Sequence, residues 1–194
     1  MSKISNLNGL VNMQSLDLSN NEISKIENLS NLQNLEHLNL SFNKISKIEN
    51  LSNLKMLIDL NLWNNKIGKI ENIDQLSRLS TICLNHNRIS KIENIGQLTG
   101  LENLFLAHNT IKELEHFKGI SHLKQLDVSF NKILKVSSLS SVFSSRFSVF
   151  RKHTTTTEQP AKLVRLNLSG NPIKKADNLC SLPEGCKIID DKKH

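Results

Sequence analysis

Residues 35–54 read LEHLNLSFNKISKIENLSNL, and residues 57–76 read LIDLNLWNNKIGKIENIDQL. The two stretches begin 22 residues apart and place hydrophobic residues and Asn at the same positions. In the first stretch the shared pattern is Leu35-x-x-Leu38-x-Leu40-x-x-Asn43, continued as Ile45-x-x-Ile48-x-x-Leu51-x-x-Leu54. A fixed period of this length is the signature of a stacked repeat protein, so this pattern decides the fold.

The unit recurs along most of the chain. Its Asn returns every 22 residues, at Asn21, Asn43, Asn65, Asn87, Asn109 and Asn131. Six units begin at Met13, Leu35, Leu57, Leu79, Leu101 and Leu123, and a seventh begins at Leu163 after an insertion. Residues 4–12 match the second half of a unit, which leaves open whether the chain is a fragment of a longer protein.

The two halves of a unit predict different local structure. Positions are counted from the first residue of each unit. Leu at positions 4 and 6 alternates with polar residues, which is the pattern of a short strand buried on one face. The Asn at position 9 is expected to turn the chain and to hydrogen-bond backbone groups that the turn leaves unpaired. The spacing of three in the second half suits a 3₁₀ turn or a short helix. One unit cannot bury its own hydrophobic face, so the units must stack.

Composition and charge exclude several classes of protein. Leu occurs 31 times, Asn 25 times and Ile 19 times among 194 residues, and 38% of all residues are hydrophobic, so a folded chain is expected. No apolar run approaches the ~18 residues of a membrane span, and the first residues do not read as a signal peptide. The formal net charge is +7, but residues 143–194 hold 10 Lys/Arg against 5 Asp/Glu. Because this excess is local, a general nucleic-acid-binding surface is not predicted.

These repeats resemble leucine-rich repeat proteins of the 22-residue subclass, typified by the leucine-rich regulatory subunit of protein phosphatase 1. The phrases Lys47-Ile48-Glu49-Asn50-Leu51 and Lys69-Ile70-Glu71-Asn72-Ile73 are close to the usual wording of that subclass. The resemblance covers residues 4 to about 142 and 161 to about 182. It implies an α/β solenoid, a horseshoe with short parallel strands on the concave face and 3₁₀ or short helical segments on the convex face.

We therefore expect one leucine-rich repeat domain over residues 1–194. Its parts are a partial repeat (4–12), six repeats (13–142), an insertion (143–160), a seventh repeat (161–182) and a C-terminal cap (183–194). In the insertion an apolar stripe on a basic helix is predicted, from Phe143, Arg146, Phe147, Phe150 and Arg151. This stripe either packs on the solenoid and extends its core, or binds a partner or a membrane surface.

Candidate binding residues are those whose size or charge is unexpected on the concave face. Trp63 and Phe105 put large rings where solvent is expected, and His86 and His108 lie near one rim of that face. Phe at position 8, in Phe42 and Phe130, is expected to tuck into the turn as part of the core. In the phosphatase-regulator family, acidic and aromatic concave residues contact the phosphatase, and by chemical type Asp17, Asp59, Trp63, Phe105 and Asp127 resemble them.

Nothing in the sequence indicates catalysis, a cofactor or a metal site. His86 and His108 are one repeat apart with Cys83 nearby, but no Cys-x-x-Cys or His-x-x-x-His spacing occurs. No Gly-rich phosphate loop and no Gly-x-Ser-x-Gly elbow occurs either. The chain is therefore predicted to be a non-enzyme without a small-molecule substrate.

The sequence thus predicts a protein-protein interaction module, or scaffold, that binds a protein partner on its concave face. By resemblance the partner is a phosphatase 1-type catalytic subunit. One alternative is a cytoskeletal or ciliary adaptor associated with dynein or microtubules. A second alternative is a binder of acidic ligands or membrane surfaces through the basic C-terminal quarter. Only three cysteines in no regular spacing indicate a reducing, intracellular location, cytoplasmic or nuclear.

Overall fold

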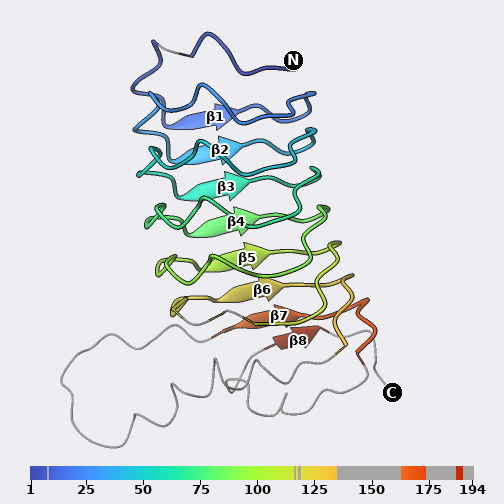
Figure 1. Ribbon diagram of the computed structural model, residues 1–194. Helices are drawn as coiled ribbons and strands as arrows, with labels where there is room; N and C mark the ends of the chain where they lie inside the picture. The colour runs from blue at the N-terminus through green and yellow to red at the C-terminus, as the bar shows by residue number, and fades with distance from the viewer. Residues whose placement is uncertain (8, 116, 118, 135–162, 174–186, 190–194) are drawn as a thin grey trace, which may run out of the picture.

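The computed structural model describes residues 1–7, 9–115, 117, 119–134, 163–173 and 187–189. These residues form an eight-stranded parallel sheet whose strands follow one another in chain order (Figure 1). The strands are β1 (Ser15–Asp17), β2 (His37–Asn39), β3 (Asp59–Asn61), β4 (Thr81–Cys83), β5 (Asn103–Phe105), β6 (Gln125–Asp127), β7 (Arg165–Asn167) and β8 (Lys187–Ile189). Each turn of the chain therefore adds one strand to the edge of the sheet, which makes the molecule a solenoid.

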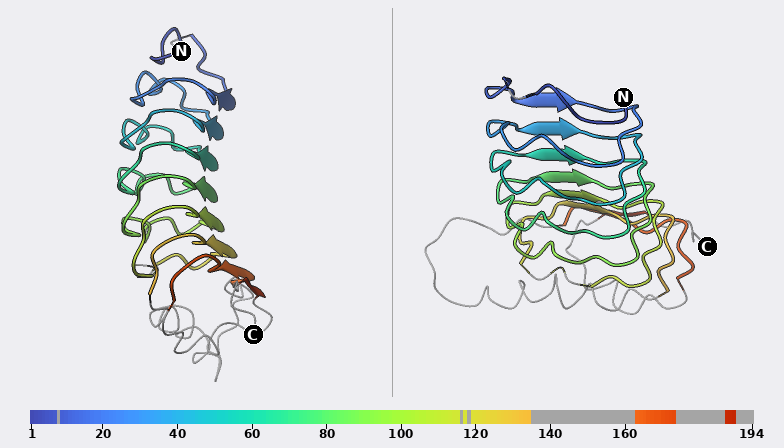
Figure 2. Two further views of the ribbon diagram at one scale, coloured as in Figure 1. Left: turned by 90° about the vertical axis from the view of Figure 1, so that its right-hand side faces the viewer. Right: turned by 45° about the horizontal axis from the view of Figure 1, so that its top comes forward.

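The register of the sheet follows the 22-residue repeat. Ser15 pairs with His37, His37 with Asp59, and Asp59 with Thr81, so equivalent positions lie side by side in successive repeats. The central residue of each strand from β1 to β7 is buried, while its two neighbours are partly or fully exposed. Seen from the side, the solenoid curves, and the strands line its concave edge (Figure 2). Their non-buried side chains therefore form the concave face.

Columns of Leu and Ile fill the space between the sheet and the returning segments. One continuous cluster of buried side chains runs from Ile4 to Ile173. The spacing of three in the second half of the unit appears as successive i to i+3 turns, for example Leu54 N–H to Leu51 C=O and Leu57 N–H to Leu54 C=O. Within the described residues, these turns do not form a helix. The predicted horseshoe is confirmed, while its convex side is made of turns where 3₁₀ or short helical segments were expected.

The Asn at position 9 makes the backbone hydrogen bonds that the sequence predicts, and these bonds form a ladder from repeat to repeat. The amide of Asn87 donates to the carbonyls of Leu62 and Leu84, at 3.0 and 3.1 Å. Its own oxygen accepts from the Ile67 amide of the preceding repeat, at 2.9 Å. The same bonds recur at Asn43, Asn65, Asn109, Asn131 and Asn171. Each Asn ties its own turn to the previous one, so neighbouring repeats are held in one register.

A second Asn ladder was not predicted. In the phrase Lys-Ile-Glu-Asn, the Asn adopts a left-handed backbone, with φ of 58° at Asn72 and 59° at Asn50. Its side-chain amide donates to a backbone carbonyl of the preceding repeat, as Asn72 does to Ile48 at 2.7 Å. Asn tolerates this backbone better than other residues with a Cβ, and its short amide reaches the carbonyl. The left-handed backbone and the hydrogen bond to the preceding repeat together account for the Asn that recurs in the phrase Lys-Ile-Glu-Asn.

The insertion and most of the cap lie outside the described residues. The helix expected in the insertion 143–160 lies outside the described residues. The same holds for its predicted stripe, which consists of Phe143, Arg146, Phe147, Phe150 and Arg151. Within residues 183–194, the structure describes β8, which pairs with β7 through Leu166 and Ile188. In the part of the chain that is described, no helix is long and apolar enough to cross a membrane.

Candidate functional site: the concave face and its ring row

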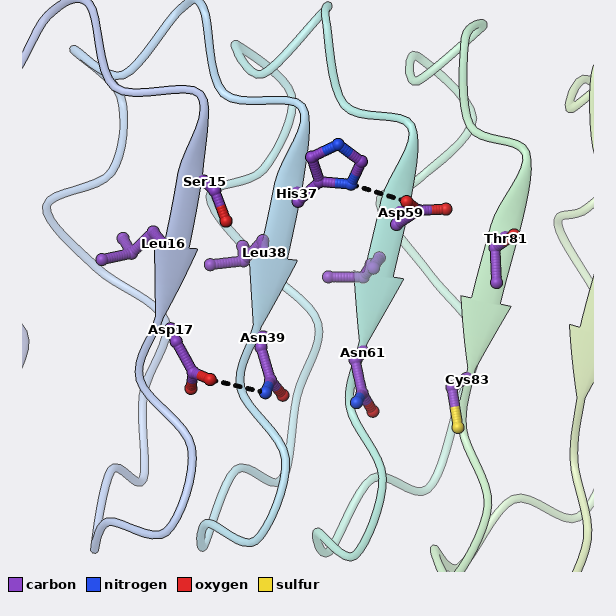
Figure 3. A pocket seen from close by; sticks show the side chains of 11 residues that line it. Ser15, Leu16, Asp17, His37, Leu38, Asn39, Asp59, Asn61, Thr81 and Cys83 are labelled. Carbon is purple, nitrogen blue, oxygen red and sulfur yellow. Dashed lines mark hydrogen bonds and ion pairs between the residues drawn. The ribbon is translucent and has the colours of Figure 1, made fainter.

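A shallow groove of about 280 Å³ lies on the concave face over the first four strands. It is lined by Ser15, Leu16, Asp17, His37, Leu38, Asn39, Asp59, Leu60, Asn61, Thr81 and Cys83. We call this set the concave groove. Its polar side chains come from positions 3 and 5 of each unit, which flank the buried Leu or Ile of the strand (Figure 3). The alternation that buries position 4 therefore also builds the groove.

Two hydrogen-bonded pairs link neighbouring strands inside the groove. His37 Nδ1 lies 2.6 Å from Asp59 Oδ2, and Asn39 donates its side-chain amide to Asp17 Oδ2 at 3.1 Å (Figure 3). The His37 and Asp59 side chains remain accessible, at 50% and 43% exposure. The lining residues include two carboxylates and no Lys or Arg, so the concave groove is acidic.

The Asp or Asn at position 5 also has a structural task. In β1 the Asp17 carboxylate accepts a hydrogen bond from the Ser19 amide at 2.8 Å, just after the strand ends. Asp127 caps the Ser129 amide in the same way at 2.9 Å, and its second oxygen accepts from Asn167 at 3.2 Å. The Ser19 hydroxyl and amide lower the pKa of Asp17, which keeps its carboxylate ionised at neutral pH. The acidic residues predicted at position 5 thus stabilise the turn after the strand and also lie on the concave surface.

Two repeats have no carboxylate or amide side chain at position 5. Cys83 in β4 and Phe105 in β5 stand where the other repeats have Asp or Asn. Burial raises the pKa of the Cys83 thiol, so at neutral pH the group is a small apolar side chain and not a thiolate nucleophile. Phe105 contributes a half-buried ring to the concave face beside it. At β4 and β5 the face is therefore less polar than at β1–β3.

Five rings from adjacent repeats form a continuous row just beyond the ends of the strands. We call this set the ring row: Phe42, Trp63, His86, His108 and Phe130. The centroid distances along it are 4.9, 6.0, 4.1 and 4.4 Å in that order. His86 stacks on His108, and His108 stacks on Phe130, whereas the rings of Phe42 and Trp63 are tilted by 58°. The row is therefore tightly stacked at one end and open at the other.

The backbone under the ring row is unfavourable for the residues that occupy it. Phe42, His86, His108 and Phe130 have φ between 52° and 55°, a left-handed conformation that costs bulky residues of order 1–3 kcal/mol each. Other repeats place Asn or Gly at the equivalent position, as Asn64 and Gly170 do. At Gly170 an added Cβ would lie 2.4 Å from the Phe130 ring, so glycine also makes room for the last ring of the row.

The expected place of Phe42 and Phe130 in the core is wrong. Phe130 is 50% exposed and Phe42 is 38% exposed, because the left-handed turn directs position 8 away from the core and onto the neighbouring rings. Trp63, at position 7, is also 38% exposed and joins the same row. Four of the five rings are thus held in solvent on a strained backbone, and neither exposure nor strain helps the chain to fold.

The central pair of the ring row contains titratable groups. Burial among its neighbours, and secondly the positive charge of His108, lower the pKa of His86. The lowered pKa favours the neutral form of the His86 ring, which stacks on His108 at a centroid distance of 4.1 Å.

The structure brings some of the predicted site residues together and separates others. Trp63, His86 and His108 belong to one row, while Phe105 makes no ring contact with them in the described structure. Asp17 and Asp59 both line the concave groove, whereas Asp127 lies three strands beyond β3. No Asp, Glu, His or Cys cluster of three or more in the described residues could hold a metal ion.

Of the side chains at position 3 of the unit, the sequence reasoning named Asp59 and missed the three others that line the concave groove. His37, Ser15 and Thr81 line the concave groove from this position. The signal was present, because positions 3 and 5 of a strand point to the same side. Ser15, His37 and Asp59 share a register across three strands, but within the described residues no hydrogen bond joins Ser15 to His37. The Ser15 hydroxyl is therefore not paired with a base in the way an activated nucleophile requires.

The 22-residue repeats, the register of the parallel strands and the concave face that they line together define a class of solenoid protein with one parallel strand per repeat. A family model described as "Leucine-rich repeat" matches residues 38–152, and one described as "Leucine Rich repeats (2 copies)" matches residues 11–53. The chain belongs to the leucine-rich repeat family. Members of this family are typically non-catalytic modules that bind other proteins. No curated protein matches the chain.

Solved structures of similar shape come from bacteria and from an animal. An internalin of Listeria monocytogenes has a TM-score of 0.78 and 25% identity, with 97% of this chain covering 50% of that one. Internalin C2 of the same organism has a TM-score of 0.78 and 23% identity, over 98% of this chain and 76% of that one. A chain in the Toll–Spatzle complex of Drosophila has a TM-score of 0.73 and 25% identity, over 88% of this chain and 23% of that one. This chain thus spans half of the first internalin and under a quarter of the chain in the Toll–Spatzle complex.

Proposed function

We propose that this chain is a non-catalytic interaction module that binds a protein partner on its concave face, between the concave groove and the ring row. The observation that carries the proposal is the ring row itself. Four of its five residues occupy a left-handed backbone, and Phe42, Trp63 and Phe130 are exposed. Exposed aromatic rings in neighbouring repeats supply large contact area at low entropic cost, which is the character of interface hot spots.

The surroundings of the row support the same proposal. The concave groove lies directly beside it, because Trp63 follows the groove residue Asn61 by two positions and donates its amide to the Asn61 side chain at 3.0 Å. A partner on this face would bury apolar rings and polar strand residues together, which is the usual composition of a protein interface. One of the similar structures, that of the Toll–Spatzle complex, is itself titled as a complex.

The identity of the partner is a finer proposal. By its resemblance to the 22-residue subclass, we take a phosphatase 1-type catalytic subunit as the first candidate and place the protein in the cytoplasm or the nucleus. Acidic and aromatic side chains, namely Asp17, Asp59 and Trp63, are available on the concave face for such a contact. Recovery of tubulin or dynein in place of a phosphatase would favour the cytoskeletal adaptor instead.

The proposal is tested by affinity capture with the full chain and two variants. Trp63→Ala/Phe105→Ala removes two concave rings and is expected to abolish partner capture while leaving the far-ultraviolet circular dichroism unchanged. Met56→Ala is the matched control, because Met56 has nearly the same exposed fraction as Trp63, 37% against 38%, but lies outside the strands. Equal capture by the wild type and the double variant would contradict a concave binding face.

The salt dependence of the same capture distinguishes the electrostatic alternative. The contacts of the buried rings should keep part of the affinity when the salt rises from 0.1 to 0.5 M, whereas binding of an acidic ligand through the basic C-terminal quarter should collapse. Loss of the partner at 0.5 M salt, together with full retention by Trp63→Ala/Phe105→Ala, would favour that alternative.

A further inference from the structure

The concave groove has the opposite charge to the chain as a whole. The formal net charge of the chain is +7, yet the groove is lined by Asp17 and Asp59 and by no Lys or Arg. Glu36, whose carbonyl accepts amides at the entrance to β3, adds a further acidic residue next to His37. A charged partner segment at this face therefore meets a negative field.

Arg165 on β7, a described residue of the basic C-terminal quarter, is too distant to cancel this field. Adjacent strands lie about 4.8 Å apart, so β7, which carries Arg165, is roughly 19 Å from β3 along the sheet. The Debye length at physiological salt is about 8 Å, so charges at that distance are largely screened. Among the residues that line the concave groove, Asp17 and Asp59 therefore decide which charge is attracted.

Both groove carboxylates can accept further hydrogen bonds. An ionised carboxylate has about four acceptor positions. Asp59 uses one oxygen toward His37, and Asp17 uses one oxygen toward the Ser19 amide and the other toward Asn39. His37 and Asn39 hold these groups in fixed positions on neighbouring strands, so a guanidinium or an ammonium meets a preorganised acceptor.

The open end of the ring row lies beside this acidic groove. Toward Phe130 the rings are nearly parallel, at 16° and 8°, so each covers the face of the next. Around Trp63 the rings are tilted by 58° and 43°, which leaves part of the indole uncovered. Trp63 is thus both exposed and adjacent to the concave groove.

We propose that the concave groove binds a basic segment of the protein partner, in which Lys or Arg side chains pair with Asp17 and Asp59 and a neighbouring apolar side chain packs on Trp63. This inference rests on the proposed function, because it names the chemistry of the partner for the same face. Charge complementarity selects the occupant, because an acidic segment or a nucleic acid strand would meet two carboxylates and no Lys or Arg among the lining residues of the groove.

The inference is tested with two labelled peptides and the full chain. The probes are the fluorescent 12-residue peptides (Arg-Leu-Gly)4 and (Glu-Leu-Gly)4, with binding followed by fluorescence anisotropy in 0.1 M salt. The basic peptide is expected to bind the wild type, and Asp17→Asn/Asp59→Asn is expected to weaken that binding about tenfold, since two accessible ion pairs are lost. The Trp63→Ala variant should also weaken it.

A second charge variant provides the matched control. Glu71→Gln/Asp74→Asn makes the same change in net charge at a separate acidic depression in the loops that follow β3. It is expected to leave the affinity within about twofold of the wild type. In Asp17→Asn the side-chain oxygen that accepts from Ser19 is retained, so folding should be preserved, and the emission of Trp63 provides a check.

Three results would overturn the inference: no binding of the basic peptide, equal weakening by both charge variants, or tighter binding of the acidic peptide. Its failure is distinguishable from failure of the proposed function. If Trp63→Ala/Phe105→Ala abolishes capture of the partner while Asp17→Asn/Asp59→Asn has no effect on either the partner or the peptide, the concave face binds a protein whose contacting segment is not basic.

Discussion

Two residues that are adjacent in every repeat serve opposite purposes, as His86 and Asn87 illustrate. Asn87 is 9% exposed, and its amide bonds to backbone groups of its own turn and of the preceding repeats. His86 is exposed, its backbone is left-handed, and its ring stacks on His108 and lies beside Trp63. The Asn at position 9 therefore holds the repeats together, while the residue at position 8 can change without loss of the solenoid fold.

The difference is visible in which residues each position accepts. Position 9 is Asn in each of the seven complete repeats, whereas position 8 is Asn, Phe, Asn, His, His, Phe and Gly in turn. A buried unpaired carbonyl or amide is costly, so few side chains can replace Asn at position 9. At position 8, Asn and Gly fit the backbone best, and the rings are present in spite of it. The ring row is thus the part of the turn that folding does not explain.

The largest effect is expected from breaking the ladder at its centre. Asn87→Ala leaves the Ile67 amide and the Leu62 and Leu84 carbonyls without their buried partner. The free energy of unfolding should fall by about 3 kcal/mol or more, measured by urea denaturation with Trp63 fluorescence. A loss below about 1 kcal/mol would mean that water replaces the Asn, and the proposed contrast between positions 8 and 9 would not hold.

The second Asn ladder should contribute less. Asn72→Ala removes one hydrogen bond, to the Ile48 carbonyl, and places a residue other than Asn or Gly at φ of 58°. We expect a loss of about 1–2 kcal/mol, and Asn72→Gly, which tolerates the backbone, should recover part of it. Identical losses in the two variants would show that the left-handed backbone does not contribute.

A substitution in the ring row should hardly alter stability. His86→Asn gives up the stacking on His108 but places the residue best suited to the left-handed backbone at φ of 54°. The two effects oppose each other, and the free energy of unfolding should stay within about 0.5 kcal/mol of the wild type. A loss as large as that of Asn87→Ala, measured in the same urea titration, would make the row part of the structural frame.

The smallest effect is expected from pH. The pKa of His86 is lowered in the folded state, so the unfolded chain binds more protons as the pH falls. This contribution to stability is therefore fully present above the ordinary His pKa of about 6.5 and is lost as the pH decreases toward the lower folded value. Unfolding measured at pH 7.5 and pH 5.5 should show a smaller difference in His86→Asn than in the wild type. A larger difference in the variant would reverse the sign of the effect.

The fold could be predicted from the sequence because one pattern specifies it many times. Leu at positions 4 and 6 and Asn at position 9 each have a single physical task, and repetition separates that task from chance. The turns of the convex side were less predictable, since a spacing of three suits both a 3₁₀ helix and successive turns. The Asn50 and Asn72 ladder was visible as a repeated residue, but its left-handed backbone was not.

The candidate site could be predicted only in part. Trp63, His86 and His108 departed from the repeat and so could be recognised, and the structure adds that their rings form one row with Phe42 and Phe130. The exposure of the two Phe depends on a backbone angle that no hydrophobicity pattern reports. His37 was missed because its contact with Asp59 joins residues 22 positions apart, which only the stacking of repeats brings together.

The central claim is that the partner binds the concave face, and site-specific photo-crosslinking tests it most directly. A benzophenone amino acid would replace Thr81 in the concave groove or Gln97 in a loop outside the strands. In the complex with the captured partner, our account predicts a covalent crosslink from position 81 and none from position 97. A crosslink from position 97 alone would contradict it.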